Sequence, residues 1–223
     1  MTRRAVLVHG AWHGAWAWEP VLPLLRDKDI EPVTVELPSA GRGGDLQDDA
    51  RVVRQAVLAD GRDTVLVGHS YGGMVITEAA LDLPRVRHLV YVCAFMLDQG
   101  DSLVTAVRDE ERLDWQDVDP EQGVIRVTDP EPTFYADLPA PVVADYCGRL
   151  TTQTITSFVQ PLSGAAWKSI DSTYLICTQD QAIPPALQRT MAKRATHRRQ
   201  IDSSHAPMAS RPQTVADLIA DSA

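Results

Sequence analysis

The chain has 223 residues, of which 44% are hydrophobic, and a formal net charge of −9 at pH 7. This length favours one domain, with room for an insertion, around a large core. The acidic balance disfavours nucleic acid and anionic membrane surfaces as partners, because both repel a negatively charged protein. We therefore expect a small-molecule partner, no nucleic acid and no membrane.

The cysteines and the N-terminus indicate a cytoplasmic protein. Cys93, Cys147 and Cys177 are odd in number, and two of them lie within apolar runs, so they predict buried small side chains rather than disulfides. The apolar run behind the N-terminal arginines is too short for a signal peptide. The longest apolar run, residues 89–97, is far below a membrane span.

Six short runs rich in β-branched residues predict strands. Most have continuous apolar centres, as in strands buried on both faces, while the last is polar enough for an edge strand. The predicted strands are residues 5–9, 33–37, 64–68, 86–94, 173–178 and 197–202.

Helical patterns lie between these runs. The clearest covers residues 46–59, with Asp45 as the expected N-cap. Others cover residues 74–82 and 186–195, and a final helix is expected to start at Ser210, with Gln213 completing a capping box. The alternation predicts an α/β fold with a mostly parallel six-stranded sheet and helices on both faces.

This alternation is interrupted between residues 97 and 168. From Asp98 to Ala140 there are twelve acidic residues against three arginines. Its aromatic side chains favour a folded insertion over disorder. We expect an α/β core of residues 1–96 and 169–223, with residues 97–168 as an inserted cap.

The stretch "TVLVGHSYGGMV", residues 64–75, carries a GxSxG pattern between a predicted strand and a predicted helix. Ser70 lies between Gly68 and Gly72, as in a nucleophile elbow, where a strained turn presents a serine hydroxyl. The alternative is an ordinary surface turn. The position between strand and helix favours the nucleophile.

A serine nucleophile needs a base and a group that orients the base. Asp180 directly follows the strand 173–178, and His205 lies between the last strand and the last helix. Taken singly, the aspartate could be a turn residue and the histidine a solvated one. The order Ser70, Asp180, His205, each after a strand, predicts a catalytic triad.

Two backbone N–H groups are the expected oxyanion donors. One belongs to Tyr71, directly after the nucleophile, and the other to Ala11, in the loop after the first strand. His9 and His13 are four residues apart but sit at a strand end without other ligands, so no metal is expected. We expect no cofactor.

Several stretches together resemble the α/β-hydrolases, and within them the plant-type methylesterase and hydroxynitrile lyase group that includes salicylic acid-binding protein 2. They span most of the chain outside the cap. They are "VLVHGAWHGAWAW", "LPSAGRGGDL", "LVGHSYGGMV", "YVCAFMLDQGDS", "YLICTQDQAIPPALQRTMA" and "SSHAPMASRPQTVADLIA".

The resemblance implies the same triad and oxyanion donors and adds a set of substrate-binding side chains from the core and the cap. These are His13, Phe95, Met96, Trp115, Phe134, Tyr135 and Phe158.

Differences from the group favour an esterase. The lyases of this group that resemble the rubber-tree enzyme have threonine and lysine at the positions of Gly10 and Ala206, so the cyanide-binding charge is missing here. Tyr71 also replaces the commoner leucine. The expected function is a serine carboxylesterase for a small, largely apolar ester, acting through an acyl-enzyme. A hydroxynitrile lyase, a natural-product tailoring enzyme and a small-molecule binding protein stay open as alternatives, as does a homodimer.

Overall fold

The computed structural model describes residues 3–107 and 115–223. Six of its strands form one sheet in the order β2-β1-β3-β4-β8-β9, and every neighbouring pair is parallel. The prediction of a six-stranded parallel sheet is confirmed. The strands are β1 (Arg3–Val8), β2 (Ile30–Thr34), β3 (Thr64–His69), β4 (Val86–Val92), β8 (Ser172–Cys177) and β9 (His197–Ile201).

The strand predicted at 33–37 begins three residues earlier, at Ile30. The prediction followed hydrophobicity, and Val35 and Leu37 are indeed buried. They pack in the core after β2 has ended, whereas the more exposed residues 31–34 form the ladder with β1. At this edge strand, the most buried residues are therefore not the ones that pair in the sheet.

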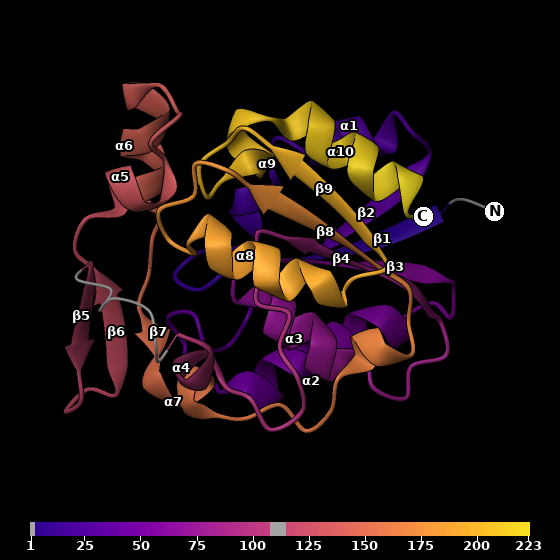
Figure 1. The fold of residues 1–223 in the computed structure, drawn as a ribbon, viewed down its shortest axis with the longest axis horizontal. Coiled ribbons are helices and arrows are strands. Elements are labelled where there is room, and N and C mark those ends of the chain that lie inside the picture. The colour runs from indigo at the N-terminus through magenta and orange to yellow at the C-terminus, as the bar shows by residue number, and fades with distance from the viewer. Residues whose placement is uncertain (1–2, 108–114) are drawn as a thin grey trace.

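Helices cover both faces of the sheet, with α1 and α10 on one face and α2, α3 and α8 on the other (Figure 1). The helices outside residues 97–168 are η1 (Ala15–Trp18), α1 (Leu22–Arg26), α2 (Leu46–Leu58), α3 (Gly72–Ala79), α8 (Pro185–Met191), η3 (Ala192–Arg194), α9 (Pro207–Ser210) and α10 (Pro212–Asp221).

Two helix starts test the capping predictions. The Asp45 side chain accepts from the backbone of Asp48, and Asp48 accepts from the backbone of Asp45, so α2 begins in a full capping box. The predicted box at Ser210 is wrong. The Ser210 hydroxyl pairs with Ser203 Oγ at 2.8 Å, and the last helix starts at Pro212.

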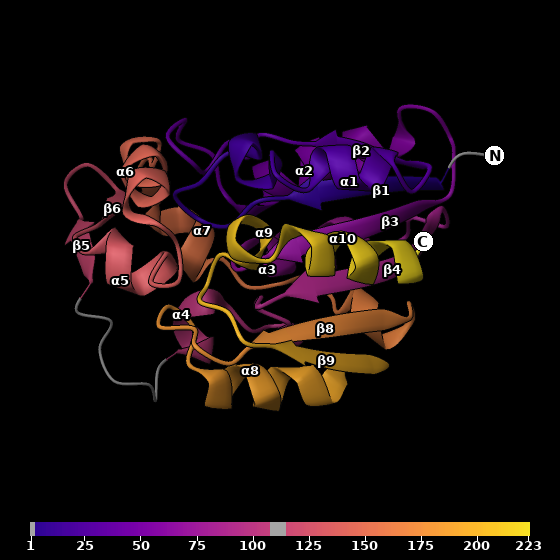
Figure 2. The same ribbon diagram turned by 90° about the horizontal axis from the view of Figure 1, so that it is seen from above.

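Residues 97–168 carry a second, three-stranded antiparallel sheet in the order β5-β6-β7, with short helices around it. Figures 1 and 2 show β5, β6, α5 and α6 beyond the carboxyl ends of the main strands. Residues 108–114 of the acidic block lie outside the described residues. The elements are α4 (Leu103–Ala106), β5 (Gln116–Asp119), β6 (Val124–Val127), α5 (Pro130–Phe134), α6 (Ala140–Gly148), β7 (Gln153–Thr154), α7 (Ile155–Val159) and η2 (Ala166–Lys168).

The core lies between the main sheet and its helices, where β3 and β8 are buried along their whole length. This agrees with their continuous apolar sequences. Among the described residues, no helix is both long and apolar enough to cross a membrane.

Candidate active site

Ser70 occupies a sharp turn between β3 and α3. Its φ of 54° lies in the left-handed region that non-glycine residues rarely adopt. Hydrogen bonds hold the strained residue, because its carbonyl accepts from the N–H groups of Gly73 and Phe95, both at 3.0 Å. The Ser70 N–H donates to Val92 O at 3.2 Å. A strained residue persists where its surroundings over-determine it, and such strain often marks functional sites.

The glycines on either side of Ser70 are required by close packing of backbone. A Cβ on Gly68 would lie 2.5 Å from Gly72 O, and one on Gly72 would lie 2.7 Å from the carbonyl oxygens of Val8 and His9. The elbow therefore packs directly against the end of β1, which brings Ser70 beside the loop that carries Ala11.

Asp180 follows β8 and is 2% exposed. Its Oδ1 accepts from the N–H groups of Ala182 and Ile183, at 2.8 and 2.9 Å. Its Oδ2 accepts from Gln188 Nε2 and stands 2.7 Å from His205 Nδ1. Because every other neighbour is a donor, the carboxylate acts as an acceptor and the histidine Nδ1–H as the fourth donor.

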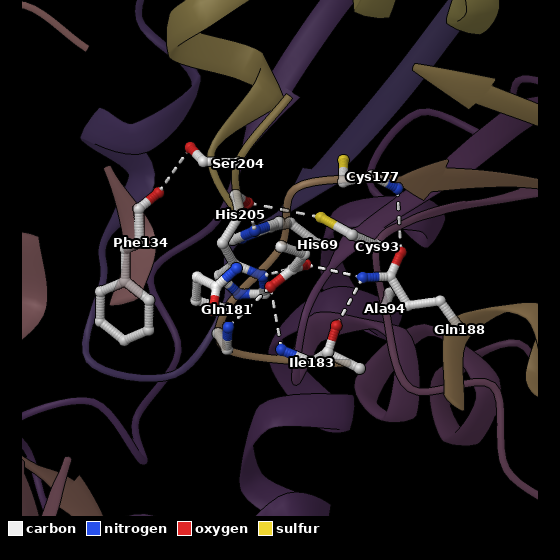
Figure 3. Close-up of polar contacts among 12 residues, drawn as sticks. His69, Cys93, Ala94, Phe134, Cys177, Gln181, Ile183, Gln188, Ser204 and His205 are labelled. Carbon is white, nitrogen blue, oxygen red and sulfur yellow. Dashed lines mark hydrogen bonds and ion pairs between the residues drawn. The ribbon is translucent and has the colours of Figure 1, made fainter. Parts of the chain in front are cut away.

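The amide of Gln188 also bonds Ile183 O at 2.8 Å and the Cys177 N–H at 3.0 Å, as Figure 3 shows. Gln188 thereby ties Asp180 to the end of β8. The sequence analysis missed this residue, since a glutamine on a short helix carries no signal of its contacts.

His205 lies in the loop between β9 and α9 and is 2% exposed. Its carbonyl accepts from His69 Nε2 at 2.8 Å and from Cys93 Sγ at 3.3 Å (Figure 3). The neighbouring Ser204 bonds Asp137 and Phe134 O in the inserted segment. Because Nδ1 is directed at Asp180, the other ring nitrogen, Nε2, is the one left to act as a base.

Ser70 and His205 line one narrow cavity at the carboxyl end of the sheet, with a free volume of about 20 Å³, which is room for roughly one water molecule. Four of the predicted substrate-binding residues line it, namely Phe95, Trp115, Phe134 and Phe158. Its other lining residues are Ala11, Trp12, Tyr71, Leu103, Gln116, Ala182 and Ile183.

The other three predicted substrate-binding residues lie outside this lining. The Met96 side chain is fully buried. His13 Nε2 pairs with Tyr135 Oη at 2.8 Å, and His13 Nδ1 with Ala11 O at 2.7 Å. Burial lowers the pKa of His13 to about 3, so the ring is neutral and joins the inserted segment to the loop of Ala11.

Ala11 and Tyr71, the predicted oxyanion donors, both line the cavity beside Ser70. Tyr71 stands at the N-terminus of α3, where backbone N–H groups lack partners within the helix. Neither N–H donates to another of the residues that the structure describes. Both N–H groups are therefore without a hydrogen-bond acceptor among these residues.

One group of side chains in the described part of the chain could approach a metal ion. Ligand atoms of His69, Cys93 and His205 lie within 4.8 Å of one another. His69 and Cys93 instead donate to the His205 carbonyl. Burial raises the pKa of the Cys93 thiol well above its ordinary value, which disfavours the thiolate that binds metals.

A larger cavity, of about 440 Å³, lies at the opposite edge of the sheet, around the amino end of β3. Its lining is rich in arginine, and Arg85 and Arg87 both pair with Asp63, at 3.2 and 3.0 Å. Ligands of open α/β sheets bind at the carboxyl ends of strands, so the cavity at Ser70 is the better candidate.

The fold and this geometry define an α/β-hydrolase. The model of the alpha/beta hydrolase family matches residues 5–218, and the chain belongs to that family. Alpha/beta hydrolase nvfD of Aspergillus novofumigatus is 31% identical over 248 residues, which cover 98% of this chain and 95% of that protein.

The resemblance to the methylesterase group is confirmed. Methylesterase 9 of Arabidopsis thaliana is 27% identical, covering 96% of this chain and 95% of its own. The solved pyrethroid hydrolase PytH superposes with a TM-score of 0.86 at 26% identity, covering 99% of this chain and 97% of its own. At the level of enzyme class, the prediction of a carboxylic ester hydrolase is confirmed by the family match and by relatives that are named as esterases.

Proposed function

We propose that the chain is a serine carboxylesterase that hydrolyses a small, uncharged, largely apolar ester through an acyl-enzyme. The observation that carries the proposal is the 2.7 Å contact between His205 Nδ1 and Asp180 Oδ2, with His205 and Ser70 lining the same cavity. A neutral imidazole held in this tautomer offers Nε2 as the base for a serine hydroxyl.

The proposed reaction runs in two halves. His205 takes the proton of Ser70 as Oγ attacks the ester carbonyl, and then gives that proton to the departing alcohol. Water, deprotonated by His205, attacks the acyl-enzyme, and the proton returns to Ser70 as the acid leaves. Asp180 holds the imidazole orientation and stabilises its positive charge in both halves.

The N–H groups of Ala11 and Tyr71 are the proposed donors to the carbonyl oxygen as it gains negative charge. Such donors, aimed beforehand, supply about 3–4 kcal/mol each to the transition state. Their position beside Ser70 in one lining and their lack of other partners among the described residues support this role.

The side chains of the cavity support an apolar substrate. Trp12 packs against Trp115, Phe134 and Phe158 with ring centroids 5.5, 5.9 and 5.6 Å apart. Of the described residues that line the cavity, none is Asp, Glu, Lys or Arg. An ionised substrate would lose its hydration there without a partner of opposite charge.

We infer that residues 97–168 form the cap over this site. Trp115, Phe134 and Phe158 of that segment supply much of the apolar lining. The free volume of about 20 Å³ is smaller than an ester of any useful size, so these side chains must move outward when substrate enters.

The test is hydrolysis of p-nitrophenyl acetate by the wild-type chain and by Ser70→Ala, with the exposed Ser169→Ala as the matched control. Ser70→Ala should lose at least about 10³-fold in kcat/KM, while Ser169→Ala keeps the wild-type rate. A fluorophosphonate should label the wild-type chain once, on the peptide that contains Ser70. Activity that survives in Ser70→Ala would overturn the proposal.

The same samples separate esterase from lyase chemistry. Ala206, where the lyases have lysine, is 2% exposed and offers no charge to cyanide. We expect no cyanide release from mandelonitrile beyond the uncatalysed rate. Release at a rate above ester hydrolysis would favour the lyase alternative.

A further inference from the structure

A carboxylate lies buried behind the elbow, on the inner face of α2. Asp49 is fully buried and accepts three hydrogen bonds from neutral donors. Its Oδ1 accepts from the Ser39 N–H at 2.9 Å, and its Oδ2 from Ser39 Oγ at 2.5 Å and from Tyr71 Oη at 2.8 Å. Burial raises the pKa of Asp49 to about 6 although these hydrogen bonds lower it. Keeping a carboxylate here is costly to stability, which invites a functional reason.

The network continues from Ser39 into the cap. Gln153, on β7, donates through Nε2 to Ser39 Oγ at 2.8 Å and to Ser157 Oγ at 2.7 Å. Its Oε1 accepts from the backbone N–H of Trp12 at 3.3 Å. Ser39, Gln153 and Ser157 are all fully buried. Every polar atom of the Gln153 amide is thus used in holding other groups.

The two ends of this network meet the two proposed oxyanion donors. At one end, the Tyr71 hydroxyl is bound to Asp49, and the Tyr71 N–H is one donor. At the other end, Gln153 holds the N–H of Trp12, which directly follows Ala11. The Trp12 carbonyl accepts from the Thr151 N–H at 2.8 Å, so the cap holds both sides of this residue.

Trp12 needs such support, because its φ is 64°, a left-handed conformation that a bulky side chain adopts only under constraint. If Trp12 relaxed, the Ala11–Trp12 peptide would turn and shift Ala11, whose own N–H lies one peptide earlier and is the proposed donor. Tyr71 likewise links the elbow to α2 through a single hydroxyl.

We propose that Asp49 and Gln153 are positioning residues. Through Tyr71, Ser39 and Trp12 they fix the positions of the two oxyanion donors relative to each other. The inference rests on the proposed function, since it concerns the same oxyanion. It assigns the cap a part in the chemical step, because Gln153 belongs to the cap. A merely structural network would contribute stability without favouring the transition state over bound substrate.

The test compares two tyrosines that lose the same atom. Tyr71 and Tyr91 are both fully buried, and each hydroxyl makes a 2.8 Å hydrogen bond, that of Tyr91 with Thr77 Oγ1, which has no hydrogen bond to the network. Tyr71→Phe keeps the backbone N–H and removes only the hydroxyl that holds it. Tyr91→Phe is the matched control.

We expect Tyr71→Phe, Asp49→Asn and Gln153→Met each to lower kcat by about 10-fold with KM within about twofold, because small displacements of reacting groups act on the transition state. The Ki of a trifluoromethyl ketone, which forms a tetrahedral adduct on serine, should rise by the same factor. Tyr91→Phe should keep kcat and Ki within about twofold of wild type. The double variant Asp49→Asn with Tyr71→Phe should be no slower than the slower single variant, since both substitutions disrupt the same hydrogen bond between Tyr71 Oη and Asp49 Oδ2.

Equal kcat and Ki for Tyr71→Phe and Tyr91→Phe would overturn the inference. Rates are counted per fluorophosphonate-reactive site, so unfolded protein does not lower them, and Tyr71→Phe alone decides if Asp49→Asn does not fold. Ser70→Ala in the same assay separates the two proposals. An inactive Ser70→Ala beside a fully active Tyr71→Phe leaves the esterase proposal standing and removes only the positioning one.

Discussion

A close backbone contact in the elbow gives a quantitative prediction for Gly68→Ala. The new Cβ would lie 2.5 Å from Gly72 O, 2.7 Å from Gly72 C and 2.8 Å from Gly73 N. Ordinary contact begins at 3.4 Å, so β3 and the start of α3 must separate by about 0.9 Å. All three atoms belong to backbone, which cannot move aside as a side chain can.

Overpacking costs about 1–3 kcal/mol, and a clash with backbone belongs at the upper end, about 3 kcal/mol. For a chain of this size each kcal/mol lowers Tm by roughly 2–4 °C, so Gly68→Ala should lower Tm by about 6–12 °C. Because Ser70 lies between Gly68 and Gly72, the same displacement moves its hydroxyl. We expect kcat for p-nitrophenyl acetate to fall by about 10²-fold.

Calorimetry and the ester assay measure both effects, with Gly148→Ala as the control. A Cβ at Gly148, in α6, meets no atom within 4 Å, so this variant should stay within about 1 kcal/mol of wild type. A Gly68→Ala variant with the wild-type Tm and rate would refute the packing argument for the elbow.

At Ser70 itself, the left-handed φ costs an L-residue about 1–2 kcal/mol while glycine loses only about 0.5–1 kcal/mol in chain entropy. Urea unfolding should therefore find Ser70→Gly more stable than Ser70→Ala by roughly 0.5–1 kcal/mol, and the reverse order would contradict the strain. Burial lowers the pKa values of His9, His13 and His69, to about 4 and about 3 for the first two, so their stabilising effect is complete above pH 6.5 and is lost on acidification. Asp49, with its pKa raised to about 6, opposes them. Below pH 6.5 the unfolded chain therefore binds more protons at these groups than the folded chain does. The free energy of unfolding should fall as the pH is lowered from 6.5 towards 5, on the order of 3 kcal/mol per pH unit, whereas a flat profile would show that these rings are charged in the fold.

Signals from residues that are close together in the sequence account for most of the correct fold prediction. The alternation of apolar strands with amphipathic helices predicted the parallel sheet, and Asp45 predicted the start of α2. Where local signals compete with tertiary partners, the prediction was wrong. Ser210 has a capping sequence, but its hydroxyl is taken by Ser203, so the helix starts at Pro212.

The candidate site likewise contains residues that the sequence could predict and residues that it could not. Ser70, Asp180 and His205 were predicted from chain order, because each follows a strand and the carboxyl ends of parallel strands share one edge. The resemblance predicted that both Phe95 and Met96 contact the substrate, but only Phe95 lines the cavity and Met96 is fully buried. Similarity of sequence indicates which segment lies near a site, but not which cavity each of its side chains faces.

The sequence by itself thus determined the sheet, the elbow and the identity of the three side chains proposed for catalysis, since these depend on periodicity and on neighbours in the chain. Only the tertiary structure decided what holds them. Gln188 joins Asp180 across eight residues, and Gln153 reaches Ser39 across 114. Such hydrogen bonds form between residues distant in sequence, and no local propensity encodes their partners.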